Sequence, residues 1–347
     1  MTSAIDLLRA LTKVPPPSFT AQERRILSTT GLPVEVGPVP DPDVAALRAE
    51  LLPLVEPLDL PGLVAAFEVA AANPVFSGRG YRTFRVPFEL MMRPVETAAH
   101  DPAEAAVALM PYEAAWKLDR KSPSIAAAYA MALATVAASM KARDTSDDGD
   151  GEAEACYERA CQVLDEVAAA AGSNWLWHRA SMSVTFLGCC LEREETEQLD
   201  LAFEALQCLD PYEFGIYEDR AGQLLPRWFG SPRALSEFAS ASADLTSDRF
   251  GETLYARIYN VALQHATLSE LDPDLTRLSQ GLYDWLERFP SQPLANRAAV
   301  LALTTGNTRM LRDLFRRHIR TIHLDQWSGD TQVRKAWLLA TREQERR

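Results

Sequence analysis

Proline divides this chain into two parts that must fold differently. Fifteen of the 22 prolines fall between Pro15 and Pro111, and the 236 residues that follow Pro111 hold only seven. Proline lacks a backbone N–H and clashes with the preceding helical turn, so the first third must be interrupted often, whereas the rest can run in long helices. We therefore expect a Pro-rich region of short helices over residues 1–100 and a helical-repeat region over residues 101–347.

The Pro-rich region alternates amphipathic stretches with turns. The stretches cover Ala4 to Leu11, Asp43 to Val55 and Leu63 to Ala72, and Pro- and Gly-containing segments separate them. The segment from Val75 to Arg93 alternates aromatic and polar residues, which is compatible with a small hairpin or an ordered loop. We expect this whole region to cap the helical repeats.

After Asp101 the pattern is helical. Ser122 and Pro123 are suited to the N-cap and first position of a helix that continues to Lys141. Further helices are expected at Glu152 to Ala171, Asn174 to Leu191, Glu195 to Leu209, Leu294 to Leu303 and Thr308 to Ile319. The acidic stretch from Asp144 to Glu152 is expected to be a solvated linker, because Ala155 stands where a calcium loop of the EF-hand type needs its closing Glu.

Three helix ends resemble one another, which indicates an internal repeat. AAWKLDRKSP (Ala114 to Pro123), EALQCLDP (Glu204 to Pro211) and DWLERFP (Asp284 to Pro290) each close a helix with a bulky apolar residue, a charged residue and a proline. Their spacings of 88 and 79 residues are about twice the period of helix-turn-helix repeats, roughly 34 to 47 residues. We therefore predict an all-α fold, a right-handed α-solenoid of helix hairpins preceded by the Pro-interrupted helical region.

Two motifs carry a family resemblance. AFEALQCLDP (Ala202 to Pro211) resembles the second helix of a tetratricopeptide or Sel1-like repeat. LLPRWFGS (Leu224 to Ser231), followed by FGETLYARIY (Phe250 to Tyr259), resembles a bacterial family of helical-repeat proteins of unknown function that carries an LLPRW-x-GS signature. The resemblance covers Pro111 to Gln264 and implies the fold, with no activity attached.

The LLPRWFGS segment has two interpretations. As a structural element, Gly230 lets the chain turn, Ser231 caps the next helix, and Trp228 fills the gap between helix pairs. As a recognition element, Arg227 and Trp228 form a binding pair, since Arg and Trp are enriched at interface hot spots. We favour the structural role for Trp228, because a Trp in a repeat protein is more often core. The candidate partner-binding residues are Arg227, Trp228, Tyr255 and Arg257.

The charge is acidic and unevenly distributed. The formal net charge of −13 argues against general affinity for nucleic acid or anionic membrane. From Asn307 onward there are ten Lys and Arg against five Asp and Glu, so the acidic excess lies in the body of the chain. No apolar run approaches the length that spans a bilayer, and the N-terminus does not resemble a signal peptide. We expect a cytoplasmic protein whose partner is another protein with a basic surface.

No pattern for a metal, cofactor or catalytic site stands out. The five histidines are scattered, and the five cysteines match neither zinc knuckles nor a disulfide framework, which favours reduced, buried thiols. The segment Ser77 to Tyr81, with Arg82, Arg85 and Arg93 after it, is a weak candidate for an anion site. We expect no cofactor and no metal.

Repeat proteins present a concave groove that binds peptides, helices or folded partners. The expected function is therefore a protein–protein interaction scaffold or adaptor rather than an enzyme. A narrower form of this hypothesis is an immunity or antitoxin-type inhibitor, because an acidic solenoid is suited to covering a basic toxin. The alternative is a hydrolase or transferase whose groove site is assembled from residues that no motif reveals.

Overall fold

The structure is a computed structural model that describes residues 20–143 and 147–341, and it is all-α. Helices make up 74% of it, and within the described residues the strands are two segments of two residues each. The prediction of an all-α, solenoid-like fold is confirmed. The amphipathic stretch from Ala4 to Leu11 lies outside the described residues.

The chain forms two compact units that do not follow the expected division at residue 101. The larger unit spans Pro40 to Phe289, and the smaller one joins residues 20–39 to residues 290–341. The helices of the larger unit are α3 (Pro42–Leu51), η1 (Leu52–Leu54), α4 (Leu60–Ala72), α5 (Arg85–Ala98), α6 (Pro102–Leu118), α7 (Pro123–Arg143), α8 (Asp147–Asp165), α9 (Ala168–Ala171), α10 (Trp175–Cys190), α11 (Thr196–Leu209), α12 (Phe214–Gln223), α13 (Pro232–Phe250), α14 (Thr253–Ala262), α15 (Leu268–Leu271) and α16 (Leu275–Arg288).

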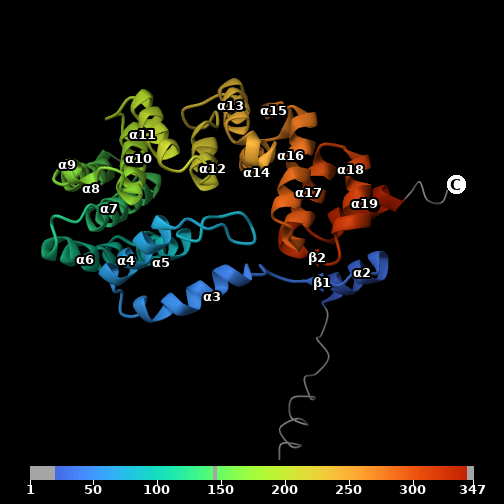
Figure 1. Cartoon of the computed structure of the whole chain (residues 1–347), viewed down its shortest axis with the longest axis horizontal. Coiled ribbons are helices and arrows are strands. Elements are labelled where there is room, and N and C mark those ends of the chain that lie inside the picture. Colours follow the sequence, from blue (N-terminus) through green and yellow to red (C-terminus); the bar gives the residue numbers. More distant parts are fainter. Residues whose placement is uncertain (1–19, 144–146, 342–347) are drawn as a thin grey trace, which may run out of the picture. The chain divides into compact units, whose positions relative to one another are not determined.

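In the larger unit each helix packs mainly on its neighbours in sequence, as in a solenoid (Figure 1). Helix α7 contacts α6, α8 and α10; α10 contacts α11; and α12, α13, α14 and α16 continue the series. Local packing of this kind needs no long-range pairing, because each helix pair buries its apolar face against the next pair.

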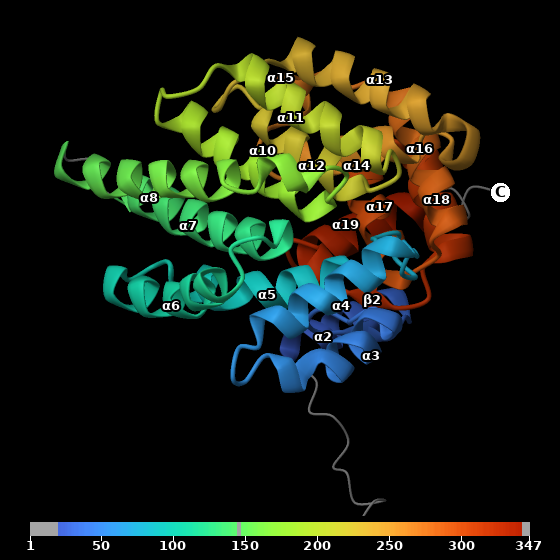
Figure 2. The same cartoon turned by 60° about the vertical axis from the view of Figure 1, so that its left-hand side comes forward.

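The Pro-rich third does not form a region of its own. Helices α4 and α5 pack on α6 and α7, so the expected boundary lies inside the larger unit (Figure 2). Pro94 lies inside α5 and Pro111 inside the 17-residue α6, so proline density does not mark short helices here. Residues 20–39 belong instead to the unit that contains the C-terminal helices.

Helix α7 is the central helix of the larger unit. Among the described helices it is the one long and apolar enough to span a membrane, over Pro123–Ala142, which corrects the expectation that no such run exists. Two thirds of that window, 67%, is buried inside the protein. Small alanine side chains let α8 and α10 approach it closely, which accounts for its apolar composition.

The smaller unit joins segments from the two ends of the described chain. Its elements are α2 (Ala21–Thr30), β1 (Val34–Glu35), α17 (Gln292–Thr304), α18 (Thr308–Asp313), η2 (Leu314–His318), β2 (Ile322–His323), η3 (Leu324–Gln326) and α19 (Asp330–Thr341). Strand β1 pairs with β2 in parallel, Val34 opposite Ile322. The buried Asn296 side chain accepts hydrogen bonds from the His323 N–H at 3.1 Å and the Trp327 indole at 2.8 Å. The Asn296 side-chain amide therefore holds β2 and the residues that follow it against α17.

Local signals in the sequence agree with the observed helix ends. The Ser122 hydroxyl accepts a hydrogen bond from Ile125 N–H at 3.2 Å, so it caps α7 as expected. The three repeated helix ends coincide with the ends of α6, α11 and α16. Helix α8, in contrast, begins at Asp147 inside the stretch expected to be a linker, whereas residues 144–146 lie outside the described residues.

The segment between α4 and α5, residues 73–84, is a small hairpin closed by one antiparallel bridge between Phe76 and Arg82, and it packs against the later helices. Residues 85–93, the remainder of the segment expected to be a hairpin or loop, belong to α5. Arg82 donates two hydrogen bonds to the Asp210 carboxylate, at 2.8 and 2.7 Å, and both side chains are largely buried. Phe76 packs against the rings of Phe214, Phe250 and Phe289, with centroids 5.5 to 5.6 Å away. This loop ties the Pro-rich region to α12, α13 and α16, and its Arg82 is not free to bind an anion.

We predict that Arg82→Ala destabilises the protein strongly. Removing the Arg82 guanidinium leaves the buried Asp210 carboxylate charged and without its ion-pair partner. This should lower the free energy of unfolding by about 3 to 5 kcal/mol. Thermal or urea unfolding followed by circular dichroism measures the change. The matched control is Lys117→Ala, since Lys117 forms an exposed pair with Glu113 four residues before it. Loss of that pair should cost no more than about 0.5 kcal/mol, and equal effects of the two substitutions would contradict the prediction.

Candidate partner-binding site

The LLPRWFGS segment forms a compact turn between α12 and α13. Trp228 N–H bonds the Leu225 carbonyl at 2.9 Å, and Gly230 passes so close to Leu224 that a Cβ would lie 2.0 Å from its carbonyl oxygen. The Ser231 hydroxyl caps α13 by accepting the Ala234 N–H at 3.1 Å. The expected roles of Gly230 and Ser231 are confirmed, and the turn presents Arg227 and Trp228 on the surface.

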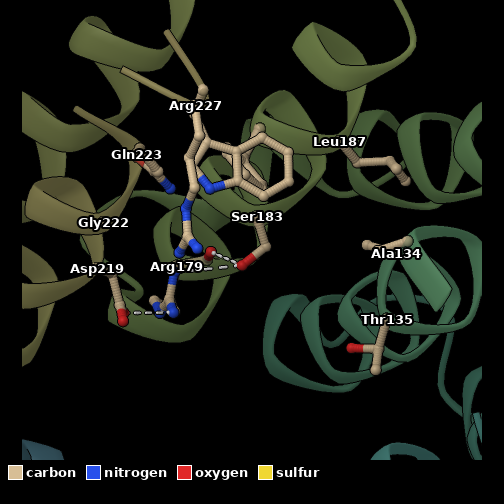
Figure 3. Close-up of a pocket in the computed structure, with 12 residues that line it drawn as sticks. Ala134, Thr135, Arg179, Ser183, Leu187, Asp219, Gly222, Gln223 and Arg227 are labelled. Atoms are coloured by element: carbon tan, nitrogen blue, oxygen red, sulfur yellow. Dashed lines mark hydrogen bonds and ion pairs between the residues drawn. The ribbon is translucent and has the colours of Figure 1, made fainter. Parts of the chain in front are cut away.

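Beside this turn lies a cavity of about 320 Å³, which we call the cationic pocket (Figure 3). Helix α7 provides an alanine-rich wall, α10 the floor, and α12 with the turn the remaining side. The residues that line it are Ala134, Thr135, Ala138, Arg179, Ser183, Phe186, Leu187, Asp219, Gly222, Gln223, Arg227 and Trp228.

Two guanidinium groups and one carboxylate set the charge of the cationic pocket. Arg179 donates a hydrogen bond to Asp219 at 2.7 Å, and its side chain is only 17% exposed. It also bonds the Ser183 hydroxyl at 3.3 Å. Arg227 is exposed and makes neither a hydrogen bond nor an ion pair with the described residues. The lining thus carries one guanidinium that no carboxylate neutralises.

Trp228 is not the core residue that its type suggested. Its side chain is 46% exposed and packs edge-on against Phe186, with ring centroids 5.6 Å apart, and at a tilt against Phe229. The structural interpretation of Trp228 as a filler between helix pairs is therefore wrong. The indole is held in place from one side and remains open to the cationic pocket.

A second cavity, of about 660 Å³, lies on the other side of the same turn, and we call it the acidic pocket. It is lined from α11, α12, α13 and the turn by Thr196, Asp200, Phe203, Glu204, Gln207, Arg220, Leu224, Phe229, Ala234, Glu237, Phe238, Ala241, Ser242 and Leu245. The lining holds three carboxylates against one guanidinium, and that guanidinium, Arg220, is already bound to Asp200. Aromatic rings form its apolar part, and Leu245 is 51% exposed.

The other two expected partner-binding residues lie in the core. Tyr255 is 1% exposed and accepts a hydrogen bond from the Asp274 N–H at 2.9 Å. Arg257 is fully buried, bonds Glu218 at 2.9 Å and lies over the rings of Tyr81, Phe214 and Trp285. Helix α14 is buried on most of its circumference, which places both side chains inside the protein. Neither can reach a partner, and this corrects the sequence-based assignment.

The buried charged groups around Arg257 form ion pairs with one another and shift each other's pKa. Burial raises the pKa of the Glu218 carboxyl, and the guanidinium groups of Arg257 and Arg85 oppose that rise. Burial alone would lower the pKa of Arg85, but Glu213 and Asp219 raise it above its ordinary value. Arg85 therefore stays charged beside Glu213, 3.7 Å away. Arg82 and Arg85 face the carboxylates of Asp210 and Glu213, and Arg93 alone of the three arginines after Ser77 to Tyr81 is exposed, so the anion site expected there is not assembled.

Sequence reasoning missed Arg179, Asp219 and the carboxylates of the acidic pocket. A partial signal was present, because Arg179, Ser183, Phe186 and Leu187 have the spacing of residues on one face of a helix. What the sequence lacked was the information that this face meets α7 and α12.

The described residues offer no group of metal ligands. In residues 20–143 and 147–341, no three His, Cys, Asp or Glu side chains come together as a metal site would require. All five cysteines are free, although Cys189 alone is buried and Cys208 is exposed. The prediction of free thiols is confirmed, and the prediction that they are buried holds for one of them.

We predict that Trp228→Ala lowers stability only modestly. Truncation of a half-exposed indole should lower the free energy of unfolding by roughly 1 to 2 kcal/mol, whereas truncation of a fully buried Trp lowers it by about 3 to 5 kcal/mol. Trp116, which is 0% exposed, provides the matched control. Comparing chemical unfolding of Trp228→Ala and Trp116→Ala tests the assignment, and similar losses would show that Trp228 is a core residue.

Similarity to known proteins gives no independent information on this site. Comparison with protein-family models, with curated proteins and with solved structures found no match to the chain. The resemblance of LLPRWFGS to the LLPRW-x-GS family therefore stays a prediction.

Proposed function

We propose that this protein is an interaction module that binds another protein through the turn between α12 and α13 and the acidic pocket beside it. The observation that carries the proposal is the exposure of Arg227 and Trp228 on a turn whose neighbouring residues Leu224 and Phe229 line the acidic pocket. A half-exposed Trp held by neighbouring rings is the kind of anchor that interfaces use, because it buries a large area at small entropic cost.

The composition of the acidic pocket indicates the chemistry of the partner. Asp200, Glu204 and Glu237 line a cavity whose other walls are partly polar and partly apolar, the apolar part being formed by Phe203, Leu224, Phe229, Phe238 and Leu245 among others. Asp200 is paired with Arg220 and Glu237 with Arg233, so Glu204 is the carboxylate of this lining left without an ion pair among the described residues. A Lys or Arg side chain fits both properties, because its methylene stem packs on apolar surface while its charged end meets carboxylates. The partner therefore presents a basic side chain within a surface that contains apolar residues. The overall charge of −13 favours its electrostatic attraction.

The pockets support binding rather than catalysis. No histidine or cysteine is among the described residues that line either pocket. The hydroxyls of Thr135 and Ser183 donate to carbonyls of their own helices, at 2.9 and 3.1 Å, and the Asp219 carboxylate of the same pocket is bound to Arg179. Five free thiols are compatible with a reducing compartment, so we propose the cytoplasm as the place of action.

We predict that charge reversal in the acidic pocket abolishes capture of the partner. The full-length chain and its Glu204→Lys/Glu237→Lys variant are immobilised, and proteins retained from a lysate are quantified by mass spectrometry. Proteins held by the wild-type chain and lost by the variant are then purified, and their binding is measured directly. Their association rate should fall several-fold between about 50 and 300 mM salt, because screening weakens attraction between charged surfaces.

The control keeps the same change in net charge away from the site. Glu50→Lys/Glu158→Lys replaces two exposed carboxylates on α3 and α8. This variant should retain the partner as the wild-type chain does. Equal loss of binding in both variants would mean that only net charge matters, and full retention by the pocket variant would remove the acidic pocket from the interface.

A further inference from the structure

The cationic pocket has features that a basic protein partner does not explain. Its volume of about 320 Å³ is at the lower end of cavities that hold small ligands. Its polar groups are mainly hydrogen-bond donors, which a cationic side chain cannot use. The pocket therefore requires a ligand of the opposite charge from the one that fits the acidic pocket.

The charge of the lining selects a monoanion. Arg179 and Asp219 neutralise each other at 2.7 Å, and the Arg227 guanidinium leaves a net charge of one. Figure 3 shows the side chains of Arg179 and Arg227 directed toward the same part of the pocket. A phosphate dianion placed there would meet the Asp219 carboxylate, and like charges at such distances repel. A carboxylate brings a single charge and a planar shape that matches a guanidinium.

The side-chain amide of Gln223 is a third hydrogen-bond donor of the cationic pocket. The Gln223 side chain is largely buried, and its oxygen accepts a hydrogen bond from Arg220 at 3.3 Å. Its amide nitrogen is therefore the end left for the pocket, and Figure 3 shows it directed inward. Amide and guanidinium N–H groups can together satisfy both oxygens of one carboxylate.

Apart from the hydroxyls of Thr135 and Ser183, which donate to carbonyls of their own helices, the rest of the pocket is apolar. Ala134 and Ala138 of α7, Phe186 and Leu187 of α10, and the open side of the Trp228 indole form its walls. These groups offer a bound molecule no polar contact except the indole N–H. The body of the ligand attached to the carboxylate must therefore be aliphatic or aromatic.

We propose that the cationic pocket binds a carboxylate joined to an apolar group, with Arg227 as its ion-pair partner and Trp228 packed on the apolar part. The Arg179–Asp219 pair positions the site and limits it to one negative charge. A small organic acid and a peptide that ends in an apolar residue share this chemistry. The inference goes beyond the proposed function. It shares Arg227 and Trp228 with it but is tested at a different cavity and with defined small probes.

Isothermal titration calorimetry on the full-length chain tests the proposal with defined probes. 3-Phenylpropionate is compared with 3-phenylpropanamide, and a short peptide ending in Phe is compared with its C-terminal amide. Inorganic phosphate is the third probe. We expect at least one of the two acids to bind with a dissociation constant of about 1 mM or tighter, its amide to bind at least about tenfold more weakly, and phosphate to bind more weakly than the acid.

The two acids distinguish the source of the carboxylate. Tighter binding of the peptide identifies a protein C-terminus as the ligand, whereas equal or tighter binding of phenylpropionate identifies a small acid. Absence of binding by both acids, equal binding of acid and amide, or preference for phosphate would overturn the proposal. Full retention of the partner by the acidic-pocket variant would overturn the proposed function and leave each of these outcomes unchanged, so the two proposals fail separately.

Substitutions in the lining of the cationic pocket, tested by the same titration, show whether the acid binds there. Arg227→Gln should weaken acid binding at least about tenfold with no change in Tm, since the guanidinium has no partner among the described residues. The control is Arg309→Gln, an exposed arginine in the smaller unit, which should bind as the wild-type chain does. Asp219→Asn should raise the affinity for phosphate relative to the acid, because it removes the charge that repels a dianion. Unchanged binding in Arg227→Gln would show that the acid binds elsewhere.

Discussion

Buried guanidinium–carboxylate pairs hold the larger unit together. Arg82 with Asp210 connects the loop at residues 73–84 to the end of α11, and Arg257 with Glu218 connects α14 to α12. The Gly80 carbonyl accepts a further hydrogen bond from Arg257 at 3.4 Å. Charges buried in this way are costly unless each has its partner, so the loop and the helices must adopt one arrangement. The Pro-rich part of the chain is thereby built into the helical repeat.

Helix α12 connects this interior network to both surface pockets. Its consecutive residues Glu218, Asp219 and Arg220 face three environments: Glu218 binds Arg257 in the core, Asp219 binds Arg179 in the cationic pocket, and Arg220 binds Asp200 in the acidic pocket. A helix advances about 100° per residue, so three adjacent charged residues must point in different directions. Fixing α12 in the core therefore fixes the polar groups of both cavities.

The turn between the pockets combines rigidity with exposure. Gly230 permits a close passage of the backbone, Ser231 starts α13, and Arg227 and Trp228 are left at the rim. Opposite charge in the two cavities makes them selective for different groups, a basic side chain on one side and a carboxylate on the other. A partner that presented both would be recognised in one orientation, because reversing it would place like charges together.

The all-α fold and several helix caps were predictable from the sequence, because periodicity and capping act over a few residues. Ser122 and Ser231 were recognisable as caps for that reason. Which residues reach the surface was decided by tertiary packing alone. Arg257 and Trp228 have residue types typical of interfaces, yet Arg257 is buried, whereas Trp228 is exposed. Arg179 and Asp219 are 40 residues apart and meet only because α10 and α12 pack beside the same cavity. No local pattern encodes such a meeting, since it depends on the packing of whole helices.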